Sequence, residues 1–281
     1  MRAKRSLGQN FLVDPNLQRK IAAALGATPG DEVLEIGPGR GELTRHLVDA
    51  VGRLILVELD DRFAADLAET YRSLDHVVVA HGDFLELDHR ALMADPTKLL
   101  VVGNIPYNIT SPIVFELLER PRPARAVLMV QREVADRVLA TPGSSAYGAL
   151  AVGVQSVARV ERVLNVPRGA FRPVPRVDST VIRMVPFRPP PLDLEEERRL
   201  RALTRVLFQW RRKQLQGILR RHPETGLSRD VVEDVGRVGG WDLSRRPETF
   251  APTDLVRMAG ILADHGWTGG GRRVAEGDAA P

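Results

Sequence analysis

Short apolar runs alternate with amphipathic stretches along the first half of the chain. The apolar runs are rich in Val, Ile and Leu and end at Gly, Asp, Asn or Glu, a pattern typical of buried strands. The stretches between them, such as 42–50 and 62–71, carry apolar residues at helical spacing, and Asp14-Pro15 predicts a capped helix over 16–25. This alternation favours a parallel sheet with helices on both faces. We therefore expect an α/β domain with strands at 32–36, 53–58, 77–81, 99–102 and 126–130.

The pattern changes in the second half of the chain. Two β-like runs, 149–157 and 179–185, lie close enough to predict a hairpin at the sheet edge, and the Pro-rich stretch 186–191 then breaks the pattern. Beyond it we expect only helices, at 194–210, 213–221, 228–238 and 253–264. The predicted organisation is a large domain over 1–190, a small all-helical domain over 191–267, and a disordered tail over 268–281.

Composition excludes several classes of chemistry. The chain has no cysteine, so disulfides, Cys-based zinc sites and a Cys adduct for methylation at C5 of a pyrimidine are all excluded. Its six histidines show no metal-ligand spacing, so we expect no metal site. The basic start Met1 to Arg5 leads into Gly8-Gln9-Asn10 rather than an apolar segment, and we expect a cytoplasmic protein. The net charge of +4 is compatible with an anionic partner but does not identify one.

Four successive predicted strands end in residues suited to a nucleoside cofactor. The first leads into the glycine loop of Gly37, Gly39 and Gly41, whose spacing fits neither a dinucleotide nor a triphosphate loop. Glu35 beside this loop favours a cationic ligand. The second strand ends at Glu58, which can accept both ribose hydroxyls, and the third is followed by Asp83, which can accept from an adenine amine. Together these strand ends predict S-adenosylmethionine as the cofactor.

The fourth strand opens into the turn Asn104-Ile105-Pro106-Tyr107. Pro106 fixes its own φ and pushes Ile105 toward extended geometry, which leaves backbone carbonyls as potential acceptors. Asn104 adds a side-chain acceptor that cannot ionise, and Tyr107 adds a ring for stacking on a base. Acceptors on both N6 hydrogens of adenine favour a pyramidal, nucleophilic nitrogen. The turn therefore predicts methyl transfer to adenine N6, although such a turn by itself could equally close a loop.

From about residue 4 to about residue 264 the chain resembles the KsgA/RsmA family of small-subunit ribosomal RNA adenine N6-dimethyltransferases. The shared motifs, in family order, are Leu7 to Leu12, the glycine loop, Gly103 to Ile109, Gln131 to Arg137, Ala146 to Gly148, Ala170 to Ser179, and Arg211-Arg212-Lys213. This resemblance implies a Rossmann-like class I methyltransferase fold with a C-terminal helical domain. It implies that Asn10 and Leu12 close over a cofactor lined by Gly37, Gly39, Glu58, Asp83 and Asn104. It also implies that Phe171 lies across the target base from Tyr107. Trp210 departs from the family pattern, interrupting the run before Arg211.

The family's reaction would be dimethylation of N6 on two adjacent adenosines in a loop near the 3′ end of small-subunit ribosomal RNA. We expect a monomer that acts in ribosome biogenesis on the small subunit or its precursor. Arg211, Arg212 and Lys213 would contact phosphates, unless they belong to a solvated helix face. One alternative is a large-subunit RNA methyltransferase of the macrolide-resistance type, which shares the turn but is disfavoured by the later motifs. Another is a ribosome-assembly factor whose main role is binding. A DNA adenine methyltransferase is disfavoured because no extra target-recognition domain is visible.

Overall fold

The computed structural model describes residues 10–106 and 109–269 and divides the chain into two compact units. The first unit contains the chain up to Leu139 together with Ala158–Phe187. The second contains Ala140–Val157 and the chain from Arg188 onward. The chain therefore leaves the first unit after Leu139, returns to it for three strands, and leaves it again before Arg188.

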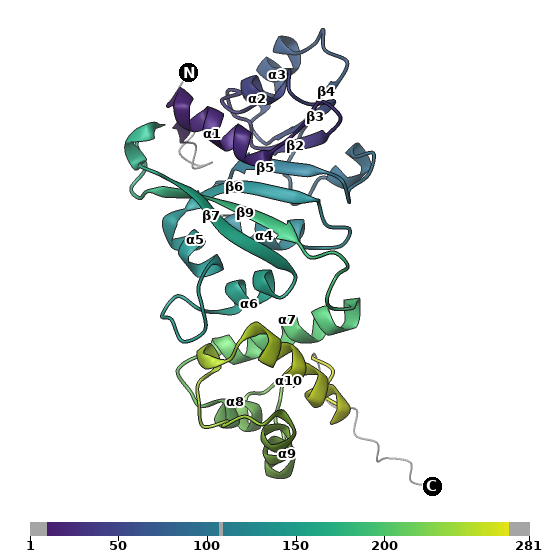
Figure 1. The fold of residues 1–281 in the computed structure, drawn as a ribbon, viewed down its shortest axis with the longest axis vertical. Helices are drawn as coiled ribbons and strands as arrows, with labels where there is room; N and C mark the ends of the chain where they lie inside the picture. Colours follow the sequence, from purple (N-terminus) through teal and green to yellow (C-terminus); the bar gives the residue numbers. More distant parts are fainter. Residues whose placement is uncertain (1–9, 107–108, 270–281) are drawn as a thin grey trace. The chain divides into compact units, whose positions relative to one another are not determined.

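A seven-stranded sheet forms the centre of the first unit, in the order β4-β3-β2-β5-β6-β9-β7 (Figure 1). Five strands are parallel, and β9 and β7 are antiparallel additions at the β6 edge. The parallel strands are β2 (Glu32–Ile36), β3 (Arg53–Glu58), β4 (Val77–His81), β5 (Leu100–Asn104) and β6 (Arg125–Gln131). The other two strands are β7 (Ala158–Val166) and β9 (Ser179–Pro186). From β2 the strand order runs outward through β3 to β4, and from the neighbouring β5 it runs in the opposite direction to β6. The sheet is therefore doubly wound, and in such sheets ligands bind beyond the carboxyl ends of the central strands.

Helices follow the parallel strands because each crossover has to return the chain to the same end of the sheet. These helices are α2 (Thr44–Leu47), α3 (Asp61–Thr70), α4 (Thr110–Leu117) and α5 (Arg132–Val138), which follow β2, β3, β5 and β6, whereas α1 (Pro15–Leu25) precedes β2. The predicted start of α1 is confirmed, since the Asp14 carboxylate accepts from the backbone N–H groups of Asn16 and Leu17. The central strands are mostly apolar, and Val33, Leu34, Val101 and Val102 are completely buried.

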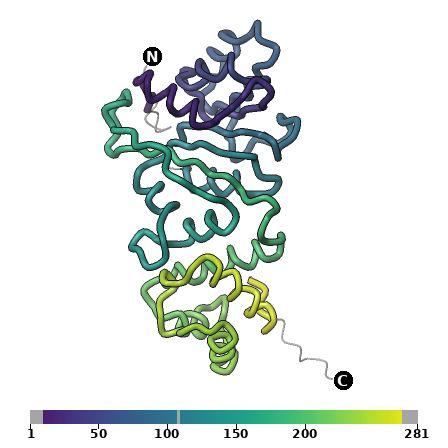
Figure 2. Tube along the Cα trace, in the orientation of Figure 1, coloured from purple at the N-terminus to yellow at the C-terminus, as the bar shows by residue number. Residues whose placement is uncertain are grey.

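A short two-stranded ladder joins two segments that lie far apart in the sequence. Strand β1 (Phe11–Leu12) pairs antiparallel with β8 (Phe171–Arg172), so that Leu12 faces Phe171 across the ladder. The backbone N–H of Val13 donates to the Ala170 carbonyl at 2.8 Å. The purple and green traces of these segments run side by side in Figure 2. This ladder attaches the N-terminal segment to the first unit.

The second unit is helical. It contains α6 (Ala149–Gln155), α7 (Leu194–Gln209), α8 (Leu215–Arg221), α9 (Arg229–Gly239) and α10 (Pro252–Asp264), the last four in green to yellow in Figure 1. Helix α7 begins with a capping box in which Asp193 and Glu196 satisfy each other's backbone N–H groups. Buried Leu, Val, Ile and Met side chains from α6, α7, α8 and α10 form the interior. The completely buried Tyr147 donates its hydroxyl to the Phe250 carbonyl at 3.0 Å.

Two sequence predictions differ from the structure. Residues 149–155 form helix α6 rather than a strand, and the predicted hairpin partner of β9 is instead β7. The sequence is ambiguous here because Leu150, Ala151, Val152 and Val154 are all buried, so the run is apolar and shows no clear period. The second break between the two units lies before Arg188, and residues 140–157 belong to the second unit. The predicted helix over 42–50 is reduced to the four residues of α2. Residues 270–281 of the predicted tail lie outside the described part of the chain.

We expect Tyr147→Phe to destabilise the second unit by roughly 1 to 3 kcal/mol, because it leaves the buried Phe250 carbonyl without its donor. All three tryptophans, Trp210, Trp241 and Trp267, belong to the second unit, so urea denaturation followed by tryptophan fluorescence reports its unfolding. Tyr71→Phe in the first unit is the control and should leave this transition unchanged. Equal midpoints for Tyr147→Phe and wild type would contradict the placement of 140–157 in the second unit.

Candidate active site

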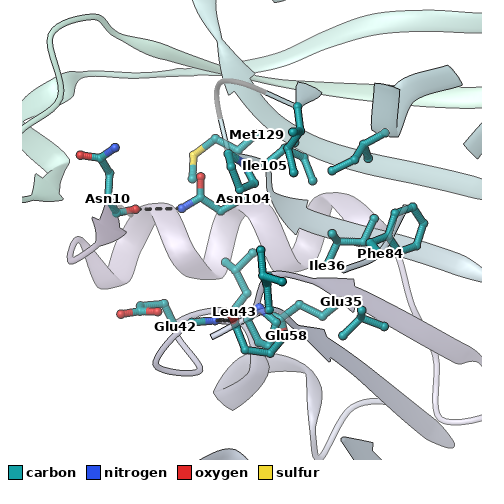
Figure 3. Close-up of a pocket in the computed structure, with 18 of the residues that line it drawn as sticks. Asn10, Glu35, Ile36, Glu42, Leu43, Glu58, Phe84, Asn104, Ile105 and Met129 are labelled. Carbon is teal, nitrogen blue, oxygen red and sulfur yellow. Dashed lines mark hydrogen bonds between the residues drawn. The ribbon is translucent and has the colours of Figure 1, made fainter. Parts of the chain in front are cut away.

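A cavity opens at the carboxyl ends of the parallel strands (Figure 3). It encloses about 1020 Å³, counting space open to solvent, which is at the upper end of the usual range for ligand pockets. All the residues that the sequence assigned to cofactor binding line it: Asn10, Leu12, Gly37, Gly39, Glu58, Asp83 and Asn104. Ile105 and Pro106 of the transfer turn line it as well. The structure thus brings into one site residues from an N-terminal segment and from four strand ends.

The glycine loop has a backbone that side chains would disfavour. Gly37 and Gly39 have φ values of 64° and 59°, in the left-handed region, and a Cβ on Gly39 would lie 3.2 Å from the Phe11 ring. The Gly37 N–H donates to the Val57 carbonyl at 2.9 Å, and the Gly39 N–H donates to Glu58 Oε2 at 2.8 Å. The loop is therefore fixed against the end of β3 and leaves an open approach for a ligand.

Glu58 holds the loop and faces the cavity at the same time. One carboxylate oxygen accepts from the Gly39 N–H and the other from the Asp60 N–H, both at 2.8 Å. A carboxylate has about four acceptor positions, so each oxygen can still accept one hydroxyl hydrogen. This arrangement supports the ribose-binding role that the sequence predicts. Burial raises the pKa of Glu58 above its ordinary value.

Two further carboxylates make one wall of the cavity acidic. Glu35 is 1% exposed, and its Oε2 accepts from the Thr44 hydroxyl at 2.7 Å. Burial, with added repulsion from Glu42 and Glu58, raises the pKa of Glu35 to about 8. Burial also raises the pKa of Glu42, a residue that the sequence argument missed although it directly follows the glycine loop. Figure 3 shows Glu35, Glu42 and Glu58 on the same side of the cavity. In the empty protein Glu35 is thus largely protonated at neutral pH, and a bound cation would favour the ionised form of these carboxyl groups.

Asp83 and Phe84 form the part of the cavity beyond β4. Asp83 Oδ1 accepts from the Leu85 N–H at 2.9 Å, which fixes the carboxylate at the end of the strand. Phe84 lines the cavity and stacks on the His89 ring, with ring centroids 4.2 Å apart and 27° between the planes. Burial lowers the pKa of His89, so this ring is neutral at neutral pH. The contact of His89 with Phe84 gives it a supporting role behind the cavity wall.

Asn104 is oriented by a long-range hydrogen bond. Its Nδ2 donates to the Asn10 carbonyl at 3.0 Å (Figure 3). Since the nitrogen is used in this way, Oδ1 is the acceptor that remains for a ligand. The Ile105 N–H donates to the Met129 carbonyl at 3.0 Å and fixes the start of the turn to β6. No described residue donates to the Ile105 carbonyl, so within this part of the chain it remains an available acceptor.

Three predicted site residues need separate comment. The Pro106 carbonyl accepts from the Ile109 N–H at 3.3 Å and from the Thr110 hydroxyl at 3.2 Å, so it is less available to a ligand than the Ile105 carbonyl. Phe171 does not line the cavity: it is completely buried in the hydrophobic core of the first unit, because its pairing with Leu12 directs the ring inward. Tyr107 lies outside the described residues.

The predicted RNA-binding residues lie in the second unit and differ in their contacts. Arg211 is half-buried, with Nη2 donating to the Ser144 carbonyl at 3.3 Å and Nε lying 3.9 Å from Glu248. Arg212 and Lys213 are exposed and line a groove. The three basic residues therefore differ in their surroundings, and their contact with RNA stays a prediction.

Neither a metal site nor a membrane span is found over 10–106 and 109–269. No cluster of three His, Asp or Glu residues with metal-binding geometry occurs in these ranges. None of the helices there is both long and apolar enough to cross a bilayer.

Three features define this protein as a class I methyltransferase: the sheet order, the glycine loop and the acidic residue at the end of β3. Comparisons with known proteins show to which methyltransferase family it belongs. A model of the ribosomal RNA adenine dimethylase family matches residues 1–234. The chain belongs to this family. It is 40% identical over 262 residues to ribosomal RNA small subunit methyltransferase A of Geobacter metallireducens, covering 92% of this chain and 95% of the relative. The protein of the same name from Prosthecochloris aestuarii is 42% identical over 256 residues, covering 91% and 92%.

Solved structures agree with this assignment. A dimethyladenosine transferase from Plasmodium falciparum superposes with a TM-score of 0.76 at 27% identity, covering 92% of this chain and 98% of that one. The 23S rRNA methyltransferase ErmE gives a TM-score of 0.68 at 30% identity, covering 90% and 100%. The predicted family, the predicted fold class and S-adenosylmethionine as the cofactor are thereby confirmed.

The acidic wall predicts a pH-dependent stability of the first unit. The pKa of Glu35 is raised to about 8 in the folded chain, so unfolding between about pH 4.5 and about pH 8 releases a proton. Stability from this group is therefore fully present below pH 4.5 and is lost as the pH rises toward 8. We expect Glu35→Gln to flatten this decline, which should amount to a few kcal/mol. Urea denaturation by circular dichroism across this pH range measures it. The exposed Glu86→Gln is the control, and parallel profiles for wild type and Glu35→Gln would contradict the argument.

Proposed function

We propose that this chain dimethylates N6 of two adjacent adenosines in a loop near the 3′ end of small-subunit ribosomal RNA. The observation that carries the proposal is the orientation of Asn104 at the cofactor cavity, where the Asn10 carbonyl occupies its nitrogen and leaves its oxygen as an acceptor. We further propose that the enzyme acts as a cytoplasmic monomer on the small subunit or its precursor.

The residues around the cavity fit the cofactor. Glu58 would accept the ribose hydroxyls, Asp83 the adenine amine, and Gly37 and Gly39 would allow close approach of the backbone. The acidic wall suits the positive charges on the sulfonium and the amino group. When bound, S-adenosylmethionine supplies an electrophilic methyl group for in-line displacement.

The chain's own contribution is to position the target amine. Asn104 Oδ1 would accept one N6 hydrogen and the Ile105 carbonyl the other, which keeps the nitrogen lone pair localised for attack. Asn104 has no ionisable proton, so it cannot act as a general base, and the N6 proton leaves to water after transfer. The target adenine has to be unpaired to reach these acceptors, which favours a loop substrate.

The relatives support the small subunit over the large one. Proteins named ribosomal RNA small subunit methyltransferase A are about 40% identical over more than nine-tenths of this chain. ErmE, which is named for 23S rRNA, is 30% identical. Incubation with labelled cofactor and either isolated subunit, followed by mapping of the modified bases, tests this choice. Label only in the large subunit would overturn the proposed substrate, and tight subunit binding without label would favour an assembly factor.

We expect Asn104→Ala to lower methyl transfer on the order of a hundredfold or more, because it removes an acceptor at the reacting amine. Single-turnover transfer to small subunits measures the rate, and circular dichroism establishes that the variant is folded. Asn16→Ala, in the exposed first turn of α1, is the matched control and should keep the wild-type rate. Wild-type turnover by folded Asn104→Ala would eliminate the proposed site.

A second prediction separates the basic residues of the second unit. Arg212→Gln with Lys213→Gln should weaken binding to the small subunit and reduce the salt dependence of that affinity, by roughly 0.7 to 0.9 in slope for each lost phosphate contact. Arg211→Gln should leave the slope unchanged and instead lower the stability of the second unit, because Arg211 contacts Ser144 and Glu248. Filter binding across a salt series measures the slopes. Identical slopes for wild type and the double variant would remove Arg212 and Lys213 from the RNA-binding surface.

A further inference from the structure

A groove in the second unit combines an exposed tryptophan with four basic side chains. It is lined by Trp210, Arg212, Lys213, Gln214, Gln216, Gly217, Arg220 and Arg221, and no acidic residue of the described ranges lines it. Trp210 is 37% exposed, and the four basic residues are exposed as well. An exposed indole among cations needs an explanation beyond helix packing.

The basic residues of the second unit fall into two groups by their partners. Arg198, Arg205, Arg229 and Arg237 each form an ion pair with a glutamate or aspartate of the same unit. Over the described ranges, none of the four basic residues of the groove forms an ion pair. Their charges are therefore not neutralised by neighbouring carboxylates, and all four gather beside the same indole. Such a groove is complementary to an anionic chain.

Trp210 is held in place from behind. Its ring meets the His222 ring edge to face, with centroids 5.0 Å apart and 63° between the planes. His222 Nδ1 accepts from the Glu224 N–H at 3.2 Å, so Nε2 carries the proton and donates to Gln209 Oε1 at 2.9 Å. The buried His222, with hydrogen bonds at both ring nitrogens, thus holds the Trp210 indole in place. A ligand ring that stacks on this indole therefore costs less conformational entropy of the Trp210 side chain.

Helix α8 supplies the open floor of the groove. Leu215, Ile218 and Leu219 are buried, while Gln216, Arg220 and Arg221 are exposed. Between them, Gly217 has no described side chain or other element within 4 Å of the position a Cβ would take, apart from its chain neighbours and its own helix. Glycine inside a helix costs roughly 0.5 to 1 kcal/mol relative to alanine, and no internal contact requires it here. Its absence of a side chain leaves the backbone open to a ligand.

We propose that this groove binds an unpaired segment of RNA, with one base stacked on Trp210 and the adjoining phosphates contacted by Lys213, Arg220 and Arg221. The inference rests on the proposed function for its choice of RNA as the anionic polymer. It adds a second recognition element to that function, because a stacking platform distinguishes an unpaired strand from a duplex whereas cations alone do not. Stacking also tolerates any base, since every base has a π face.

The test is binding of labelled hexacytidylate by fluorescence anisotropy, with full-length protein and no cofactor. This oligonucleotide has no adenine for the transfer site, so the result does not depend on methyl transfer. We expect Trp210→Leu to weaken binding about 5- to 150-fold without changing the salt slope. Trp210→Phe should restore most of the affinity while abolishing the quenching of tryptophan fluorescence that binding causes. Arg220→Gln with Arg221→Gln should weaken binding and reduce the salt slope.

Matched controls separate the groove from general charge. Arg229→Gln with Arg237→Gln removes the same charge from ion-paired positions of the same unit and should leave affinity almost unchanged. A duplex RNA of equal charge should bind more weakly than hexacytidylate and should be insensitive to Trp210→Leu. Wild-type affinity of Trp210→Leu for hexacytidylate, or equal loss from the two arginine pairs, would overturn the proposal. Failure to methylate ribosomal RNA would overturn the proposed function and leave these binding results in place.

Discussion

The hydrogen bond from Asn104 Nδ2 to the Asn10 carbonyl connects the parts of the candidate active site. Asn104 is placed by the end of β5, and Asn10 directly precedes β1, whose pairing with β8 holds the N-terminal segment. The bond therefore links the transfer turn to a segment 94 residues earlier in the chain. The Asn104 side-chain amide has a donor nitrogen and an acceptor oxygen. Because the nitrogen is bonded to the Asn10 carbonyl, the oxygen is the atom that can bind a substrate. The proposed chemistry at adenine N6 depends on that orientation.

The acidic wall shows how binding can oppose stability. Burial raises the pKa of Glu35, Glu42 and Glu58, which means that the folded chain disfavours their ionised forms. Two features offset part of this cost: the Thr44 hydroxyl bonds Glu35, and two backbone N–H groups bond Glu58. A cationic cofactor would offset more. Residues that lower the stability of the ligand-free protein are expected at sites where they bind a ligand.

Much of the first unit could be predicted because its strands are local patterns. The bounds 32–36, 53–58 and 77–81 are confirmed, since each run is apolar and ends at a residue that marks the strand terminus. The convergence of Glu58, Asp83 and Asn104 follows from parallel topology alone. Features set by tertiary contacts could not be predicted in this way. Most of helix α6 is buried, the Phe171 ring lies in the core where β8 pairs with Leu12, and Arg211 contacts Ser144 and Glu248. None of these contacts leaves a periodic signal in the sequence.

The pH profile of Asn104→Asp is the most direct test of the central claim. Aspartate keeps the acceptor for adenine N6, but when ionised it cannot donate to the Asn10 carbonyl. The account predicts that single-turnover methyl transfer by the variant, as a ratio to wild type at each pH, is low at neutral pH. It also predicts that the ratio rises on acidification, because a protonated carboxyl regains the donor. A ratio near one at neutral pH, with no dependence on pH, would show that the bond to Asn10 does not orient the catalytic amide.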